Sequence, residues 1–127
     1  MQKSRLIPVR DAPEEIARRL AIIAGQPQLN AILGINPEAQ AQAHICQSQR
    51  RRGQLLGPLH GVPLIVKDNI ACTGLPVTAG CQALAALRST GDALVVRRLR
   101  AAGAIILARA NMSEFAFDVR SRSSLGG

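Results

Sequence analysis

Lys67 is the residue whose type and position in this sequence best suit acid–base chemistry. It follows the apolar residues 64–66, which read as a short buried strand, and does not lie on the polar face of a helix. A low-dielectric interior disfavours the charged ammonium form, so a lysine buried at a strand end can be held as a neutral amine that acts as a general base. Asp68 does not cancel this effect, because successive strand residues point to opposite faces. The alternative is a lysine whose stem is covered while its head reaches water, and periodicity alone favours that alternative.

The cysteines and histidines predict neither a metal site nor a thiol nucleophile. Cys46, Cys72 and Cys81 are widely spaced, no C-x-x-C pair occurs, and His44 and His60 are the only histidines. A structural zinc site needs four close ligands, usually at tight spacing. His44 and Cys46 lie two residues apart in a predicted helix, where they point to different faces. We therefore expect reduced, partly buried thiols, as in a cytosolic protein, and no metal.

The composition is that of one globular domain, or of part of a larger one. The 127 residues are 47% hydrophobic and 19% charged, which is too apolar for a disordered chain. The longest apolar stretch, residues 101–108, is far shorter than the roughly 18–20 residues that span a bilayer. The first residues lack the continuous apolar core of a secretory signal. These features predict a cytoplasmic protein that neither crosses a membrane nor is secreted.

The formal net charge of +8 raises the question of a nucleic-acid partner. Proteins that bind single strands usually interleave basic residues with base-stacking aromatic residues, but here Phe115 and Phe117 are the only aromatic residues. The densest basic run, residues 50–52, lies at the end of a predicted helix, where cations favour the negative end of the helix dipole. We do not expect specific nucleic-acid binding.

Two helices are predicted in the first part of the chain, residues 1–54. Asp11 and Glu14 have the spacing of a capping box, apolar residues then recur every three to four positions, and Gly25 ends the pattern. Pro37 opens a second helix that runs to Gly53. Neither helix carries an obvious chemical group, so this region is predicted to be scaffold.

The remainder, residues 55–127, reads as strand, helix, strand. Residues 62–66 form a short buried strand, a helix runs from Asp92 to Gly103, and residues 104–107 follow at once as a second buried strand. Apolar strands that alternate with a helix indicate an α/β protein whose sheet is covered on both faces.

Four segments occur in the order found in the amidase signature family. They are residues 57–69 (GPLHGVPLIVKDN), 78–80 (TAG), 92–104 (DALVVRRLRAAGA) and 111–116 (NMSEFA). Residues 29–31 and the helix from Pro37 also fit the family, so the chain resembles it over nearly its whole length. This resemblance implies a mixed β-sheet sandwiched between α-helices.

The resemblance also implies a mechanism. Members hydrolyse or transfer the amide of small carboxamides with a serine nucleophile, a second serine that has a cis peptide bond, and a lysine. Lys67 occupies the lysine position, where it would accept a proton relayed from the nucleophile through the second serine. Serine–lysine chemistry needs no cofactor or metal.

The two serines have no clear counterpart in this sequence. Ser123 and Ser124 form a pair, but the glycines of the family's serine segment precede its serines, whereas here Leu125 and two glycines follow. The family also usually places the bridging serine further from the lysine than Ser123 lies. The alternative interpretation is a polar loop that caps nearby backbone groups. On either interpretation the nucleophile lies beyond Gly127.

We therefore expect an incomplete amidase-signature domain. Residues 1–127 would be its N-terminal fragment, with the scaffold in 1–54 and the catalytic lysine in 55–127. The fragment would be inactive alone, because a base with no nucleophile cannot start acyl transfer. A C-terminal half encoded separately is a possible partner. The alternatives are part of an A-type component of a glutamyl-tRNA amidotransferase, and a non-catalytic binding or scaffold module.

Further expectations concern packing. Leu94, Val95 and Leu99 should form the apolar face of the third helix, and one face of residues 105–107 should lack partners. Asn111 and Glu114 should cap a short helix. Met112, Phe115 and Phe117 should pack against the sheet, and the alternative is a place near the substrate pocket. His60 should be structural. Residues 108–110 read ARA where many members of the family have Gly-Lys-Thr, which puts the packing of a turn at Arg109 in doubt.

Overall fold

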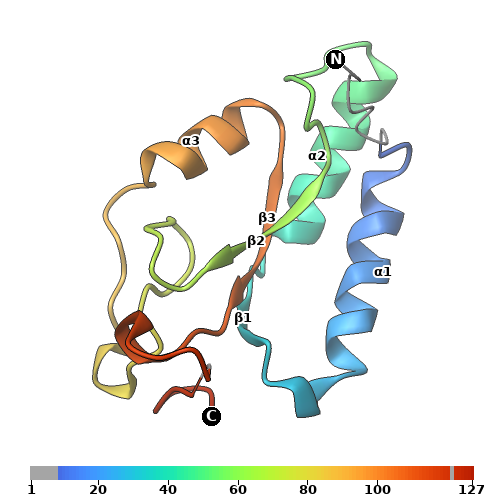
Figure 1. Ribbon diagram of the computed structural model, residues 1–127. Helices are drawn as coiled ribbons and strands as arrows, with labels where there is room; N and C mark the ends of the chain where they lie inside the picture. The colour runs from blue at the N-terminus through green and yellow to red at the C-terminus, as the bar shows by residue number, and fades with distance from the viewer. Residues whose placement is uncertain (1–8, 121) are drawn as a thin grey trace, which may run out of the picture.

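A computed structural model describes residues 9–120 and 122–127 and shows a small mixed sheet between helices (Figure 1). Its α-helices are α1 (Ala12–Ala24), α2 (Ala39–Arg51) and α3 (Leu94–Ala101). Its strands are β1 (Ile32–Ile35), β2 (Pro63–Lys67) and β3 (Ile105–Ala110), and short 3-10 turns cover Pro27–Leu29, Gln82–Leu84 and Glu114–Ala116. The predicted α/β class is confirmed.

β3 is the central strand of the sheet. The strand order is β1-β3-β2, with β2 parallel to β3 and β1 antiparallel to it. Strand β1 was not predicted, because it is short and contains Gly34. A register shift between Ile32 and Gly34 interrupts its pairing with β3. This strand brings the N-terminal region into the same sheet as β2.

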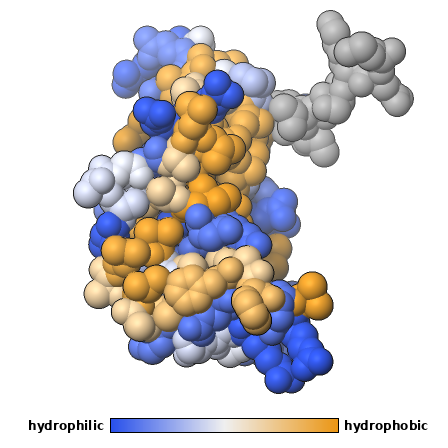
Figure 2. Space-filling model, turned by 60° about the vertical axis from the view of Figure 1, so that its left-hand side comes forward, coloured by the Kyte–Doolittle hydropathy of each residue, from blue (hydrophilic) through white to orange (hydrophobic). Residues whose placement is uncertain are grey.

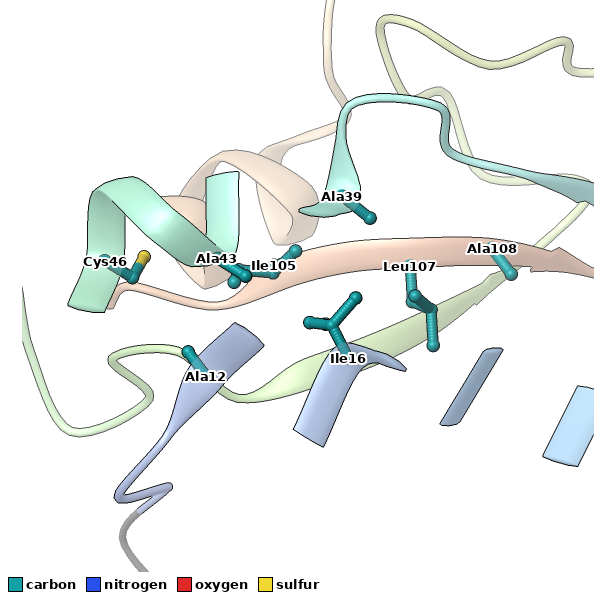
Figure 3. Packing of buried hydrophobic residues seen from close by; sticks show 8 residues of the cluster. All are labelled: Ala12, Ile16, Ala39, Ala43, Cys46, Ile105, Leu107 and Ala108. Carbon is teal, nitrogen blue, oxygen red and sulfur yellow. The ribbon is translucent and has the colours of Figure 1, made fainter. Parts of the chain in front are cut away.

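Helices cover the two faces of the sheet from opposite sides. On one face, α1 and α2 pack against Ile105 and Leu107, and Figure 3 shows Ile16 of α1 and Ala43 of α2 at this contact. On the other face, Val96 of α3 packs with Ile106. Because alternate residues of β3 are buried on opposite faces, its apolar run needs cover on both sides.

The register between β2 and β3 contains one irregularity. Leu64 pairs with Ile106, but the next residue, Ile65, pairs with Ala108, so β3 carries one extra residue. Beyond this bulge Arg109 lies beside Val66 on the α3 side of the sheet. Lys67, which follows Val66, points to the opposite side.

The first helix begins as its sequence predicts, whereas the second begins slightly later. The Asp11 carboxylate accepts a hydrogen bond from the Glu14 N–H at 2.9 Å and caps α1. At α2, the Asn36 side chain accepts from Glu38 N–H at 3.0 Å and donates to the Ile106 carbonyl at 2.7 Å. Asn36 therefore fixes a turn to the sheet, and the regular helix starts at Ala39 rather than at Pro37.

Several of these expectations are wrong. Leu94 and Val95 are exposed, and Val96 is the fully buried residue of α3. Ile105, Ile106 and Leu107 are all buried, because α1 and α2 cover one face and α3 the other. Residues 114–116 form a 3-10 turn instead of a helix, and only Met112 of the three predicted packing residues is buried, since Phe115 and Phe117 are exposed.

His60 has the structural role expected of it. The Leu56 N–H donates to Nδ1 at 3.2 Å, so the ring proton is on Nε2, which donates to the Cys46 carbonyl at 2.8 Å. The ring therefore joins α2 to the segment before β2.

In the part of the chain that the structure describes, no helix has the length and apolar character needed to cross a bilayer.

Candidate active site

Lys67 is the last residue of β2, at the edge where the two parallel strands end together. It pairs with Ala110, the last residue of β3. Two loops meet at this edge: the Phe115 N–H, after β3, donates to the carbonyl of Ala79, after β2, at 2.9 Å. The carboxyl ends of parallel strands are the usual place for ligands in open α/β sheets.

The Lys67 side chain is exposed, so the apolar surroundings expected from the sequence are not supplied by the described residues. Among those residues no carboxylate forms an ion pair with its Nζ atom. The backbone of Lys67 is therefore fixed by its pairing in the sheet, whereas its Nζ atom has no ion-pair partner among the described residues.

Asp68 has the opposite environment, because it points to the other face of the sheet. Its side chain is 1% exposed. Oδ1 accepts a hydrogen bond from the Thr78 N–H at 3.1 Å, and Oδ2 accepts one from the Gly80 N–H at 3.0 Å and another from the Thr78 hydroxyl. The carboxylate is thus committed to the loop of residues 78–80, as the alternation of strand residues predicts.

Arg109 lies beside this carboxylate and donates to main-chain carbonyls of residues 67–76, the segment that leads from the end of β2 to the loop of residues 78–80. Its side chain is 1% exposed, and Nε lies 3.8 Å from Oδ1 of Asp68. Nε donates to the Pro76 carbonyl at 2.7 Å, while Nη1 donates to the carbonyls of Lys67 at 3.1 Å and Ile70 at 2.5 Å. Burial lowers the pKa of Arg109. The buried guanidinium therefore holds three main-chain carbonyls of residues 67–76 by hydrogen bonds.

The position of Arg109 shows how residues 108–110 pack, which the sequence left open. Residues 108–110 form the end of β3 rather than a turn, and Arg109 faces a loop that supplies carbonyl acceptors. Sequence reasoning missed Arg109 and Asp68 as partners. The available signal was a single charged residue in a strand of apolar residues, which requires a buried partner.

Ser123 and Ser124 bond to their surroundings in the C-terminal turn. The Ser123 hydroxyl donates to Oδ1 of Asn111 at 3.1 Å and accepts from the Gly126 N–H at 2.8 Å. The Ser124 hydroxyl accepts from the Gln82 N–H at 2.9 Å. These contacts match the interpretation of a polar loop that caps backbone groups.

Two hollows flank this edge of the sheet. An apolar one of about 490 Å³ lies between the C-terminal half of α1 and β1, with Ile65 in its wall. A second, of about 380 Å³, is lined by Asp68, Thr78 and Arg109 together with β1 residues.

In the described ranges no cluster of three metal-ligating side chains occurs, and the three cysteines are free and buried.

Comparison with known proteins gives one family and several solved relatives. The family model described as Amidase matches residues 14–127. The A component of the glutamyl-tRNA(Gln) amidotransferase of Chloroflexus aggregans is 42% identical over 104 residues, which are 81% of this chain and 21% of that protein.

The solved structures share the fold as well as the sequence. Native peptide amidase from Stenotrophomonas maltophilia matches with a TM-score of 0.86 and 38% identity, over 92% of this chain and 26% of that one. Allophanate hydrolase of Kluyveromyces lactis matches with a TM-score of 0.70 and 34% identity, over 91% of this chain and 19% of that one. The chain spans about a fifth of the length of the curated relatives it matches.

Proposed function

The chain belongs to the amidase family, and from this we propose that Lys67 is the proton-accepting base of an amide-cleaving site whose serines lie outside residues 1–127. The observation that carries this proposal is the position of Lys67 at the carboxyl end of a parallel strand pair, with a free head and a fixed backbone.

The proposed reaction proceeds through an acyl-enzyme. The amine of Lys67 accepts the proton that leaves the serine nucleophile, relayed through the second serine, as the serine oxygen bonds to the amide carbon. Collapse of the tetrahedral intermediate breaks the C–N bond, and the proton returns from the lysine to the leaving nitrogen. Water then releases the acid and restores the serine.

The environment of Asp68 supports a free Lys67. If the neighbouring carboxylate were available, it would pair with the ammonium group and hold it protonated. Here Asp68 is buried on the opposite face and bonded to Thr78 and Gly80. In this proposal, residues outside 1–127 supply the apolar surroundings of the Lys67 side chain.

The substrate class is a carboxamide, and two variants of the activity are proposed. Direct hydrolysis is supported by the peptide amidase and allophanate hydrolase among the solved relatives. Glutamine-dependent amidation of glutamyl-tRNA(Gln) is supported by the name of the Chloroflexus aggregans relative. Hydrolysis of simple carboxamides without tRNA favours the first, and ammonia release that depends on glutamine and glutamyl-tRNA favours the second.

The first test is to read the coding sequence after Gly127, in all frames, for a glycine-rich serine segment and a later serine. The protein that contains them, joined to residues 1–127 or co-expressed with them, should cleave carboxamides. Lys67→Ala should abolish this activity, and Lys67→Arg should not restore it, because a guanidinium stays protonated at neutral pH. Arg97→Ala, which removes an exposed charge of α3, is the matched control and should leave the activity intact.

Labelling with a fluorophosphonate gives an independent check. We expect the complete protein to be labelled at a serine after residue 127 and residues 1–127 alone not to be labelled. A complete protein that remains active as Lys67→Ala would refute the assignment of the base, and labelling at Ser123 or Ser124 would refute the assignment of the serines.

A further inference from the structure

Arg109 is a charged residue in an almost entirely buried strand, and its hydrogen bonds all go to one loop. Burying a guanidinium is costly unless its donors are satisfied. A neutral side chain such as Met would fill the same space without that cost. Nε and Nη1 are satisfied by the main-chain carbonyls of Lys67, Ile70 and Pro76, whereas Nη2 has no partner among the described residues. In that part of the chain no other side chain donates to these three carbonyls, which explains why a charged donor group lies here.

The loop that Arg109 binds starts at the proposed base itself. The Lys67 carbonyl accepts from Arg109 Nη1 at 3.1 Å and also from the Ile70 N–H at 3.1 Å, which closes a tight turn directly after β2. On the other side of this peptide bond, the Asp68 side chain is fixed by Thr78 and Gly80. The backbone of Lys67 is therefore constrained by the sheet before it and by two buried charged groups after it.

We infer that Arg109 is a positioning residue for Lys67. By holding the Lys67 carbonyl from the α3 side of the sheet, it fixes the direction in which the lysine side chain leaves the opposite side. The bulge in β3 makes this possible, because it places Arg109 beside Val66 and on the same side as Asp68. Arg109 touches neither the substrate nor the reacting atoms in this role, which rests on the proposed function of Lys67.

The planar guanidinium suits this task better than an ammonium group. Its donors point in fixed directions from one plane and reach three carbonyls at once, whereas a lysine amine is a flexible point charge. Arg109→Lys should therefore preserve the buried positive charge but hold fewer of the three carbonyls. Arg109→Met should fill the space and hold none.

The test compares Arg109 variants with a destabilised core variant in the complete, active protein. For Arg109→Met we expect kcat to fall about 10- to 100-fold, because small displacements of a catalytic group have effects of this size, while KM stays unchanged. Arg109→Lys should recover part of kcat. The control is Ile16→Ala, which empties a fully buried site on the opposite face of the sheet without touching the loop.

A second measurement keeps the inference testable if Arg109→Met does not fold. Hydrogen exchange of the Ile70, Thr78 and Gly80 amides reports on the backbone after β2, since Ile70 donates to the Lys67 carbonyl and the other two donate to the Asp68 carboxylate. We expect faster exchange at these amides in Arg109→Lys and no change there in Ile16→Ala. Unchanged exchange in Arg109→Lys, or a kcat in Arg109→Met that falls no further than in Ile16→Ala, would overturn the inference.

The outcome can be separated from that of the proposed function. If Lys67→Ala retains activity, the proposed base is wrong whatever Arg109 does. If Lys67→Ala is inactive and the Arg109 variants behave as Ile16→Ala does, the base stands and the positioning role fails.

Discussion

Asp68 and Lys67 are adjacent in sequence but lie in opposite environments. Lys67 has an exposed head, while the Asp68 carboxylate is buried beside Arg109 and accepts three hydrogen bonds from Thr78 and Gly80. Strand alternation assigns the two residues to opposite faces, and this much follows from the sequence. The partners of Asp68 do not, because they depend on a loop fold and on the β2–β3 register.

Removal of the Asp68 carboxylate should therefore be costly. In Asp68→Ala three donors lose their acceptor and Arg109 loses its counter-ion, so we expect a loss of about 3–5 kcal/mol in the free energy of unfolding. Asp68→Asn keeps the shape and one acceptor oxygen and should lose less. Urea denaturation measures both, with Asn69→Ala, at an exposed neighbouring site, as the control. A loss in Asp68→Ala as small as in the control would contradict the network.

At the scale of elements, the connection from α3 to β3 depends on Gly103. The sequence predicts that Gly103 ends this helix, and the structure confirms it: α3 ends at Ala101, Ala102 follows as its C-cap, and Gly103 comes next with φ of +94°. A Cβ atom there would lie 2.6 Å from the Cα atom of His60. The close approach could not be predicted, because His60 is distant in sequence and belongs to the segment before β2.

Gly103→Ala should destabilise the protein through both effects, the positive φ and the contact with the backbone of His60. We expect a loss of more than about 2 kcal/mol in the free energy of unfolding. Gly91→Ala is a matched control, since a Cβ atom at Gly91 would meet no atom within 4 Å. Thermal unfolding of the two variants should separate them clearly, and equal melting temperatures would argue against the close packing of α3 and β3 on this segment.

Asp92 joins the start of α3 to the loop after β2, although the sequence predicts it as the first residue of the helix. Its Oδ1 accepts from the N–H and hydroxyl of Thr73 at 2.6 and 2.9 Å, and Oδ2 lies 3.0 Å from Arg100 Nε. The helix itself begins at Leu94. Asp92, whose position predicts a helix start, therefore binds Thr73 of the loop after β2 and does not begin α3.

These contacts make the stability of the chain depend on pH. Burial opposes the charged form of Asp92, but the hydrogen bonds from Thr73 and the charge of Arg100 outweigh it and lower the pKa of Asp92 below its usual 3.8. The stabilisation is therefore complete above the unfolded value and is lost as the pH falls through the lower folded value. Asp92→Asn should cost about 1 kcal/mol at pH 7. The difference from the unsubstituted chain should shrink below the usual pKa of an aspartate, and a difference that stays constant at low pH would contradict this assignment.

At the scale of the whole molecule, the fold class, the strand β3 and the position of Lys67 follow from the sequence, whereas the exposed surface does not. Apolar periodicity places Leu94 and Val95 on a helix but cannot tell which side meets the sheet, because the adjacent Val96 fits equally well. Figure 2, which turns the side that carries α3 forward, shows hydrophobic patches interrupted by hydrophilic residues. In the described residues, β1 and β2 also leave their outer edges unpaired.

Residues 1–127 alone should therefore self-associate. Exposed apolar side chains and unpaired strand edges favour association, while the net charge of +8 opposes it by repulsion. Because salt screens that repulsion, added salt should increase the apparent mass in light scattering at a fixed concentration. The double variant Leu94→Gln, Val95→Gln should reduce this increase with little loss of stability, since both side chains are already exposed. Ile65→Gln tests the edge of β2 in the same way, and a chain that stays monomeric at high salt would show that neither surface needs a partner.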